Sequence, residues 1–371
     1  MPPQLFQFLE TGSEVSIDEG GLMAFREVFV RIAECIVAAR SITLDDIVSQ
    51  LFDAGMITED IGEQGLQCVR YLVFSVLGWQ TMLFKPAPMG CNPRQFTIED
   101  EQDGYRGQAY VSLQQDIDAS SKETLSELLM GFGVLLPSKN LFLSDDAEEQ
   151  KAFQEQVDVH AKRLNANIIV TVAGVRLKWV DTLACHMEYN PAKKELYLFR
   201  FPSFCVSRLH TANQSVIHAC ATSSRLHCQW ATDADVDGLL REILLSYRLL
   251  FGQSKKSRAL FRSLDPFAGH SRSDCDPLLP GLCGKRSCPG YLDLSEKETY
   301  YLPGDFPVLR YRISLLQKHL SRSVSRTWTQ LWRDKRDSAH WLTFWALISF
   351  GVLGILLALL QVILQFVELL L

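Results

Sequence analysis

The sequence predicts an α+β folded part, followed by a basic amphipathic helix and one C-terminal transmembrane helix. Three observations predict this class. Apolar residues recur at helical spacing over much of residues 1–90 and again over 235–251. Between them, short segments of residues 168–199 alternate or run apolar, as strands do. Near the C-terminus, twenty residues pass without a charge.

The uncharged segment runs from Trp341 to Leu360, and we assign residues 338–367 to a transmembrane anchor. About twenty residues of helix cross a hydrocarbon core of ~30 Å. Trp341 and Trp345 lie at its start, as interfacial aromatic residues do. Small residues recur within it at helical spacing, which would let a second copy approach closely or would arise by chance: Gly351, Gly354 and Ala358.

Basic residues precede the anchor and none follows it. Between residues 310 and 336 the acid Asp334 stands alone against a series of bases: Arg310, Arg312, Lys318, Arg322, Arg326, Arg333, Lys335 and Arg336. The positive-inside rule therefore places the N-terminal side in the cytosol, so we expect a tail-anchored protein. The N-terminal residues have no secretory-leader pattern. The long apolar span favours the endoplasmic reticulum over the mitochondrial outer membrane.

Residues 301–337 are predicted to form the basic amphipathic helix. Its apolar side chains recur at steps of three and four: Leu309, Ile313, Leu316, Leu320, Val324, Trp328 and Trp332. Two interpretations stay open. The stripe would lie in the lipid headgroup layer, or it would pack against the cytosolic domain.

The helical region, residues 1–90, contains apolar periodicity over 22–39, a capping pattern at Thr43 and a long segment over 60–84. The apolar run within that last segment is about fourteen residues long, too short to span a bilayer, so we expect a buried core helix.

Residues 91–251 are expected to be α+β with an antiparallel β region. We expect strands at 105–113, 168–173, 176–180, 186–189 and 195–199, and helices at 122–130, 147–164 and 235–251. The residues Asn190 to Lys193 predict the turn before the last strand. Residues 252–300 are rich in Gly, Pro, Ser and charge, and predict a flexible linker or loop.

Charge is divided unevenly along the chain. Residues 1–150 hold 24 acids against 9 bases, whereas the remainder carries the excess of bases within a net charge of −6. The division disfavours a nucleic-acid binder and suits a C-terminal part that lies against anionic lipid, unless the acids are simply a solvated surface. The ten cysteines are scattered and suggest a reducing compartment.

Two metal-like patterns fail on spacing. Asp233, Asp235 and Asp237 match the start of a calcium loop, but its twelfth position is Leu244 instead of Glu. Residues Thr232 to Asp237 more simply cap the following helix. A group of zinc-type ligands is irregularly spaced: His210, His218, Cys220, His227 and Cys228. We therefore assign no catalytic, cofactor-binding or metal-binding residue, and expect no cofactor.

Two blocks carry a resemblance. Trp332 to Ala346 (WRDKRDSAHWLTFWA) resembles a block of uncharacterised filamentous-fungal proteins that end in a single membrane helix. Trp179 to His186, followed by Leu198 to Phe204, is similar to a second block of that group. The resemblance implies the same topology and a fungal origin, and it implies no activity.

Two functions stay open. The favoured one is a non-enzymatic interaction or scaffold protein that holds a cytosolic protein partner at the lipid bilayer. The alternative is a motif-less enzyme or accessory protein of a fungal biosynthetic pathway that acts on a lipophilic metabolite. Its residues would be sought at Trp179, Asp181, His186 and 200–204, although ordinary β-sheet packing is the favoured explanation for each of them.

Overall fold

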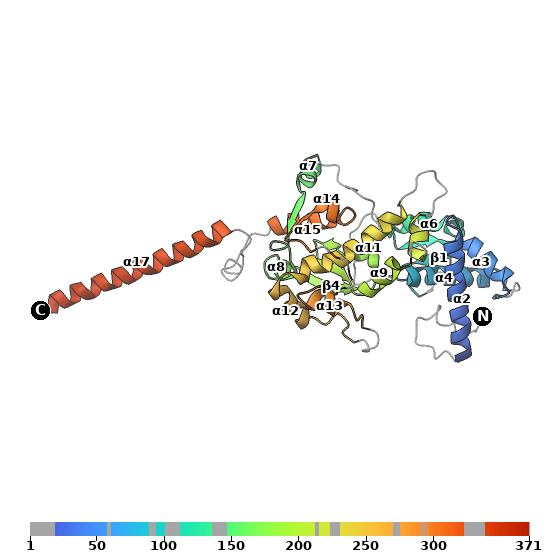
Figure 1. The fold of residues 1–371 in the computed structure, drawn as a ribbon, viewed down its shortest axis with the longest axis horizontal. Helices are drawn as coiled ribbons and strands as arrows, with labels where there is room; N and C mark the ends of the chain where they lie inside the picture. The colour runs from blue at the N-terminus through green and yellow to red at the C-terminus, as the bar shows by residue number, and fades with distance from the viewer. Residues whose placement is uncertain are drawn as a thin grey trace.

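One end of the folded part is built from the helices α2 (Glu19–Ala38), α3 (Leu44–Asp53) and α4 (Gly62–Thr81) (Figure 1). The computed structural model describes residues 19–57, 61–88, 94–100, 112–135, 147–211, 215–222, 231–269, 275–290, 292, 294, 296–322 and 338–370. Thr43 caps α3 as predicted, because its hydroxyl accepts a hydrogen bond from the Asp46 amide at 3.0 Å. The centre of α4 is fully buried, so the predicted core helix is confirmed.

A small hairpin follows α4. Strands β1 (Gln95–Thr97) and β2 (Gln114–Asp116) pair antiparallel, and α5 (Ile117–Ser120) and α6 (Leu125–Phe132) come next. The predicted helix over 122–130 corresponds to α6, which Thr124 caps together with Glu127. Most of the strand predicted at 105–113 lies outside the described residues; β2 begins just after it.

The central sheet has the order β4-β6-β5, from β4 (Arg176–Val180), β5 (Tyr189–Asn190) and β6 (Glu195–Phe199). The β5–β6 pair is an antiparallel hairpin, and Asn190 Oδ1 accepts hydrogen bonds from the amides of Ala192 and Lys193, each at 3.1 Å. The β4–β6 pair is parallel, so the expected antiparallel region is wrong for β4. Residues 181–188 carry the chain past β6, and β4 therefore meets β6 in the same direction.

Two other predicted elements differ. The segment expected as a strand over 168–173 is the helix α8 (Ala166–Thr171), whose first turn is capped by Asn165. β-branched residues favour strands only weakly, and here the cap overrides them. The helix expected over 147–164 ends early: α7 (Ala147–Glu155) gives way to β3 (Asp158–His160), which pairs with β7 (Thr299–Tyr301).

Helices α9 (Pro202–Leu209), α10 (Val216–Thr222) and α11 (Asp233–Tyr247) link the sheet to the N-terminal helices. α11 continues into a π-helical turn, η3 (Arg248–Gly252). The buried apolar side chains form one connected core that runs from α2 to α15 (Arg310–Arg322). The described residues of 1–90 and 91–251 therefore share a core.

The segment predicted as a flexible linker, 252–300, contains the helices α12 (Lys255–Ser263) and α13 (Leu279–Gly284). Arg248, fully buried, holds it in place: its guanidinium donates to the carbonyls of Leu282 and Arg286 at 2.6 Å and pairs with Glu296 at 2.7 Å. A Cβ at Gly252 would lie 2.5 Å from this guanidinium, so the π-turn needs glycine there. The linker prediction is corrected, because polar bonds replace the missing apolar periodicity.

The last elements are α14 (Leu302–Asp305), α15 and α17 (Ser338–Leu370). In Figure 1, α8, α12 and α15 lie at the end from which the chain leads to α17, and α2 and α3 lie at the opposite end. The fold is thus mixed α and β, with one C-terminal apolar helix that could span a membrane.

Candidate membrane anchor and its attachment to the fold

Helix α17 presents an apolar surface that the described residues leave uncovered. Residues 345–362 carry no charge, and none of them is buried. Leu347, Phe350 and Ile355 are 70%, 74% and 68% exposed. Leaving one such side chain in water costs about 1.5–3 kcal/mol, and by length and composition this helix could cross a membrane instead.

The predicted anchor residues lie in different parts of this helix. Trp341 falls in its first turn and Trp345 in its second, where Trp345 is half-buried. A Cβ added at Gly351 or Gly354 would meet nothing within 4 Å, so the face that they share with Ala358 is open. Four predicted juxtamembrane bases lie outside the described residues: Arg326, Arg333, Lys335 and Arg336.

The apolar stripe of α15 packs against the fold. Leu309, Ile313 and Leu316 are fully buried, and Leu320 is 3% exposed. Val324, Trp328 and Trp332 lie outside the described residues. Of the two interpretations left open for this helix, packing on the domain therefore holds for its described part.

A buried carboxylate from α11 caps the start of α15. Glu242 accepts hydrogen bonds from the backbone amides of Val308, at 3.1 Å, and Leu309, at 2.7 Å. A carboxylate at a helix N-terminus satisfies unpaired amides and complements the positive end of the helix dipole. Glu242 thus ties the helix that leads to the anchor to the centre of the fold.

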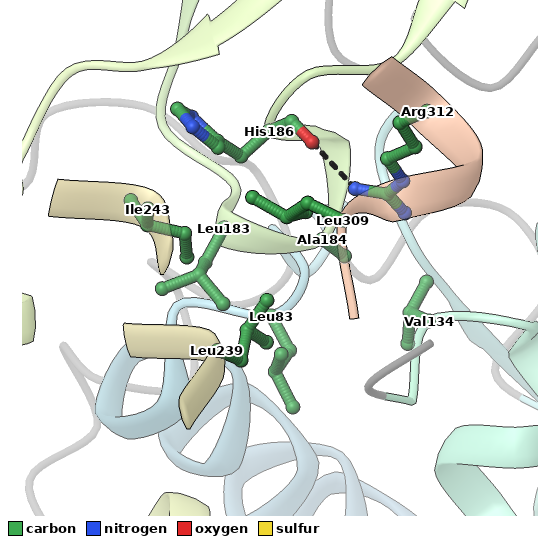
Figure 2. A pocket seen from close by; sticks show the side chains of 9 residues that line it. All are labelled: Leu83, Val134, Leu183, Ala184, His186, Leu239, Ile243, Leu309 and Arg312. Carbon is green, nitrogen blue, oxygen red and sulfur yellow. Dashed lines mark hydrogen bonds between the residues drawn. The ribbon is translucent and has the colours of Figure 1, made fainter. Parts of the chain in front are cut away.

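Two arginines of α15 point into the protein. Arg310 donates to the carbonyl of Phe153 at 3.0 Å and lies 4.4 Å from the centre of its ring. Arg312 forms an ion pair with Glu188 at 2.8 Å and donates to the carbonyl of His186 at 2.5 Å (Figure 2). These two positive charges are used within the fold and are not directed to lipid headgroups.

A small cavity lies beside this attachment, where α15 meets α11 and the segment before His186 (Figure 2). Its volume is about 10 Å³, the size of one water site. The lining is mostly apolar: Leu83, Val134, Leu183, Ala184, His186, Leu239, Ile243, Leu309 and Arg312. An organic substrate needs several hundred cubic ångströms, so this cavity has no room for one.

His186 is fixed as a neutral ring. The Phe199 amide donates to its Nδ1 at 3.2 Å, so the proton lies on Nε2, which donates to Ser246 Oγ at 2.7 Å. Ser246 in turn donates to the Ile243 carbonyl. Burial, with a smaller contribution from the Arg312 charge, lowers the pKa of His186 to about 3. Such a ring is a weak base and serves here as a structural bridge between η2 (Leu183–Cys185), β6 and α11.

The other residues singled out for an enzyme also take part in packing. Trp179 stacks on Phe251, with ring centres 6.2 Å apart. Asp181 pairs with Arg200, whose guanidinium also lies over the rings of Phe201 and Phe267. The ordinary-packing interpretation of these positions therefore accounts for their contacts.

The three carboxylates of the calcium-like pattern diverge. Asp233 pairs with Arg40 at 2.8 Å, Asp235 closes the capping box of Thr232, and Asp237 bonds to His218. The helix-cap interpretation thus describes Asp235. Cys220 of the zinc-like group is buried within the core, and burial raises the pKa of its thiol.

Sequence reasoning missed one polar row. Ser215 Oγ lies 2.6 Å from His218 Nδ1, and His218 Nε2 lies 3.1 Å from Asp237 Oδ1. Ser–His–Asp rows occur in hydrolases, where the serine must reach a substrate. Ser215 and His218 are 3% and 0% exposed, so within the described residues the row joins the start of α10 to α11.

Comparison of the chain with protein-family models, with curated proteins and with solved structures finds no match. Its function is therefore argued from its own residues.

Proposed function

We propose that the chain is a single-pass, tail-anchored membrane protein that holds a cytosolic protein partner at the bilayer without catalysing a reaction. The observation that carries the proposal is the contrast between the uncovered apolar surface of α17 and the firm attachment of α15 to the fold. The helix that precedes the anchor in the chain is buried in the fold over its described residues, which supports a scaffold that holds its partner near the bilayer.

The cytosolic orientation rests on charge. Bases precede α17, and residues 345–371 contain none. Such asymmetry favours retention of the basic side in the cytosol. The endoplasmic reticulum remains the proposed membrane because of the length of the apolar span, and the fungal origin rests on the resemblance alone.

The topology test uses the full chain with a glycosylation-acceptor tag after Leu371, expressed in yeast. We expect the protein to resist carbonate extraction and the tag alone to be glycosylated. The sequon at Asn213 is the internal control, because its glycosylation would place the folded part in the lumen and overturn the proposal. Release of the protein into the supernatant by carbonate would contradict the assignment of α17 as a membrane anchor.

The partner test addresses α2, at the end of the fold away from the anchor (Figure 1). Met23, Val30 and Val37 recur every seven residues and are 51%, 47% and 36% exposed, so they share one helix face. The protein is purified in detergent, and co-purifying proteins are identified by mass spectrometry. A partner present in stoichiometric amount, and lost from the Val30→Glu variant, would support the scaffold. Loss of the partner from the control Lys151→Gln, an exposed residue of α7 away from this face, or no partner in several purifications, would contradict it.

Homodimerisation through Gly351, Gly354 and Ala358 is a separate proposal, supported by the open small-residue face. Gly354→Ile fills that face, so a dimer in detergent should become a monomer by light scattering. This interface would be excluded if the protein without the substitution is already a monomer, or if the Gly354→Ile variant remains a dimer.

The cavity gives no support to the alternative of a lipophilic-metabolite enzyme, because its volume of about 10 Å³ matches a water molecule.

A further inference from the structure

A basic surface lies at the end of the fold from which the chain leads to the anchor. Helix α12 has the sequence KKSRALFRS, with four bases and no acid. Its inner face is fixed: Phe261 is 7% exposed, and the fully buried Ser257 donates to Asn165 Oδ1 at 3.1 Å. Lys255, Lys256 and Arg262 are consequently turned outward and exposed.

The β5–β6 turn adds further bases to this end. Lys193 and Lys194 are exposed, and the Lys194 carbonyl accepts from the amide of Arg176, which is itself 69% exposed. Glu195, the next residue, is buried and pairs with Arg176 at 2.9 Å, so it offsets the Arg176 charge and the two lysines supply the rest. This turn therefore presents positive charge to solvent.

Contacts place these parts on one end of the molecule. Tyr189, beside the turn, packs on His319 in the last turns of α15, with ring centres 4.8 Å apart. β4 begins next to the turn and α8 packs against both β4 and α12. Figure 1 shows α8, α12 and α15 together at this end.

The opposite end of the fold holds a group of acids. Helix α3 holds Asp45, Asp46 and Asp53, and the neighbouring segment holds Asp118 and Glu123. We call this end the acidic end; two of its acids, Asp45 and Asp118, pair with Arg70.

We propose that the exposed bases Arg176, Lys193, Lys194, Lys255, Lys256 and Arg262 form a surface that binds anionic phospholipid headgroups and holds the folded part against the bilayer. Each base near an anionic leaflet is attracted to it, and the attraction extends only about a Debye length of 8–10 Å. The anchor brings this surface within reach. The inference rests on the proposed membrane insertion and adds the orientation of the domain.

The test uses the full chain in lipid nanodiscs, one set neutral and one set containing phosphatidylserine. Lysine acetylation is followed residue by residue by mass spectrometry. We expect Lys194, Lys255 and Lys256 to be acetylated more slowly with the anionic lipid, and 0.5 M NaCl to abolish the difference. Lys122, exposed at the opposite end, is the internal control and should not change.

A variant pair isolates α12. K255E/K256E reverses two exposed charges at the start of a helix, where acids are tolerated, and should abolish the slower acetylation of Lys194. The matched control R26E/K122E makes the same change in net charge at the acidic end and should keep it.

The outcomes separate the two proposals. A chain that fails to enter either nanodisc contradicts the proposed function itself. A chain that inserts but shows equal lysine reactivity in both lipids overturns the headgroup surface alone. RNA is added to the protein in neutral nanodiscs as a second polyanion. If RNA slows acetylation of these lysines and phosphatidylserine does not, the assignment to lipid is also overturned.

Discussion

Helices α4 and α17 are both long and apolar, yet they meet opposite surroundings. Tyr71 to Leu77 of α4 are nearly or fully buried, whereas none of residues 345–362 of α17 is buried. The difference lies in the polar groups at the edges of α4. Gln80 donates to the Phe29 carbonyl at 2.7 Å, and Arg70 pairs with Asp45 at 2.7 Å. These groups orient α4 against specific neighbours, while α17 has a uniform surface that suits lipid on every side.

The largest expected effect breaks α17. Leu353→Arg with Leu357→Arg places two charges in the middle of the span, at a cost of about 5–7 kcal/mol by the insertion scale. We expect the protein to move from the carbonate-resistant pellet to the supernatant. The control Leu353→Ala with Leu357→Ala should remain in the pellet. A charged variant that also remains in the pellet would contradict the assignment of α17 as the anchor.

The next effect breaks α4. Phe74 stacks on Phe84 and Phe96 with ring centres 4.7 Å apart in each case, and it is fully buried. Phe74→Ala should lower the free energy of unfolding by about 3–5 kcal/mol, measured by denaturant titration in detergent. Phe350→Ala in α17 should leave that free energy unchanged, and equal losses in both variants would contradict the comparison.

A smaller effect tests the helix between them. Glu242→Gln replaces a carboxylate that accepts from two amides with a group that offers one oxygen, which should cost about 2–3 kcal/mol. Trypsin should then cut faster at Arg310 and Arg312. The exposed Glu27→Gln provides the control, and an unchanged cleavage rate would show that Glu242 does not secure α15.

The smallest effect concerns pH. The folded pKa of His186, about 3, lies below its ordinary value of 6.5, so the unfolded chain takes up a proton first as pH falls. The neutral ring's contribution to the free energy of unfolding is complete above pH 6.5 and falls as the pH drops below that value. The free energy of unfolding should decrease by about 2 kcal/mol between pH 7 and pH 5. His186→Gln should flatten this dependence in denaturant titrations. The fraction of protein that floats with vesicles in a density gradient should not change between pH 7 and pH 5, because residues 345–362 contain no titratable side chain.

Prediction from sequence succeeded where the determinants are local. The Thr43 and Thr232 caps, the turn at Asn190 and the core helix at α4 each depend on residues a few positions apart, and each is found. It failed at residues 252–300. There Arg248 reaches carbonyls 34 and 38 residues further along, and no local pattern encodes that reach. The parallel β4–β6 pair was missed for the same reason, since alternation does not specify strand direction.

The site shows the same limit. The apolar stripe of α15 was visible at steps of three and four, but whether it faced lipid or protein depended on Glu242, 67 residues before Leu309. By itself the sequence determined that one segment is too uniformly apolar for water and that bases precede it, because both are sums over neighbouring residues. Only the tertiary structure decided which bases pair within the fold, as Arg310 and Arg312 do, and which are exposed to solvent, as those of α12 are. A charge faces water or pairs internally according to what packs beside it, and long-range packing sets that neighbour.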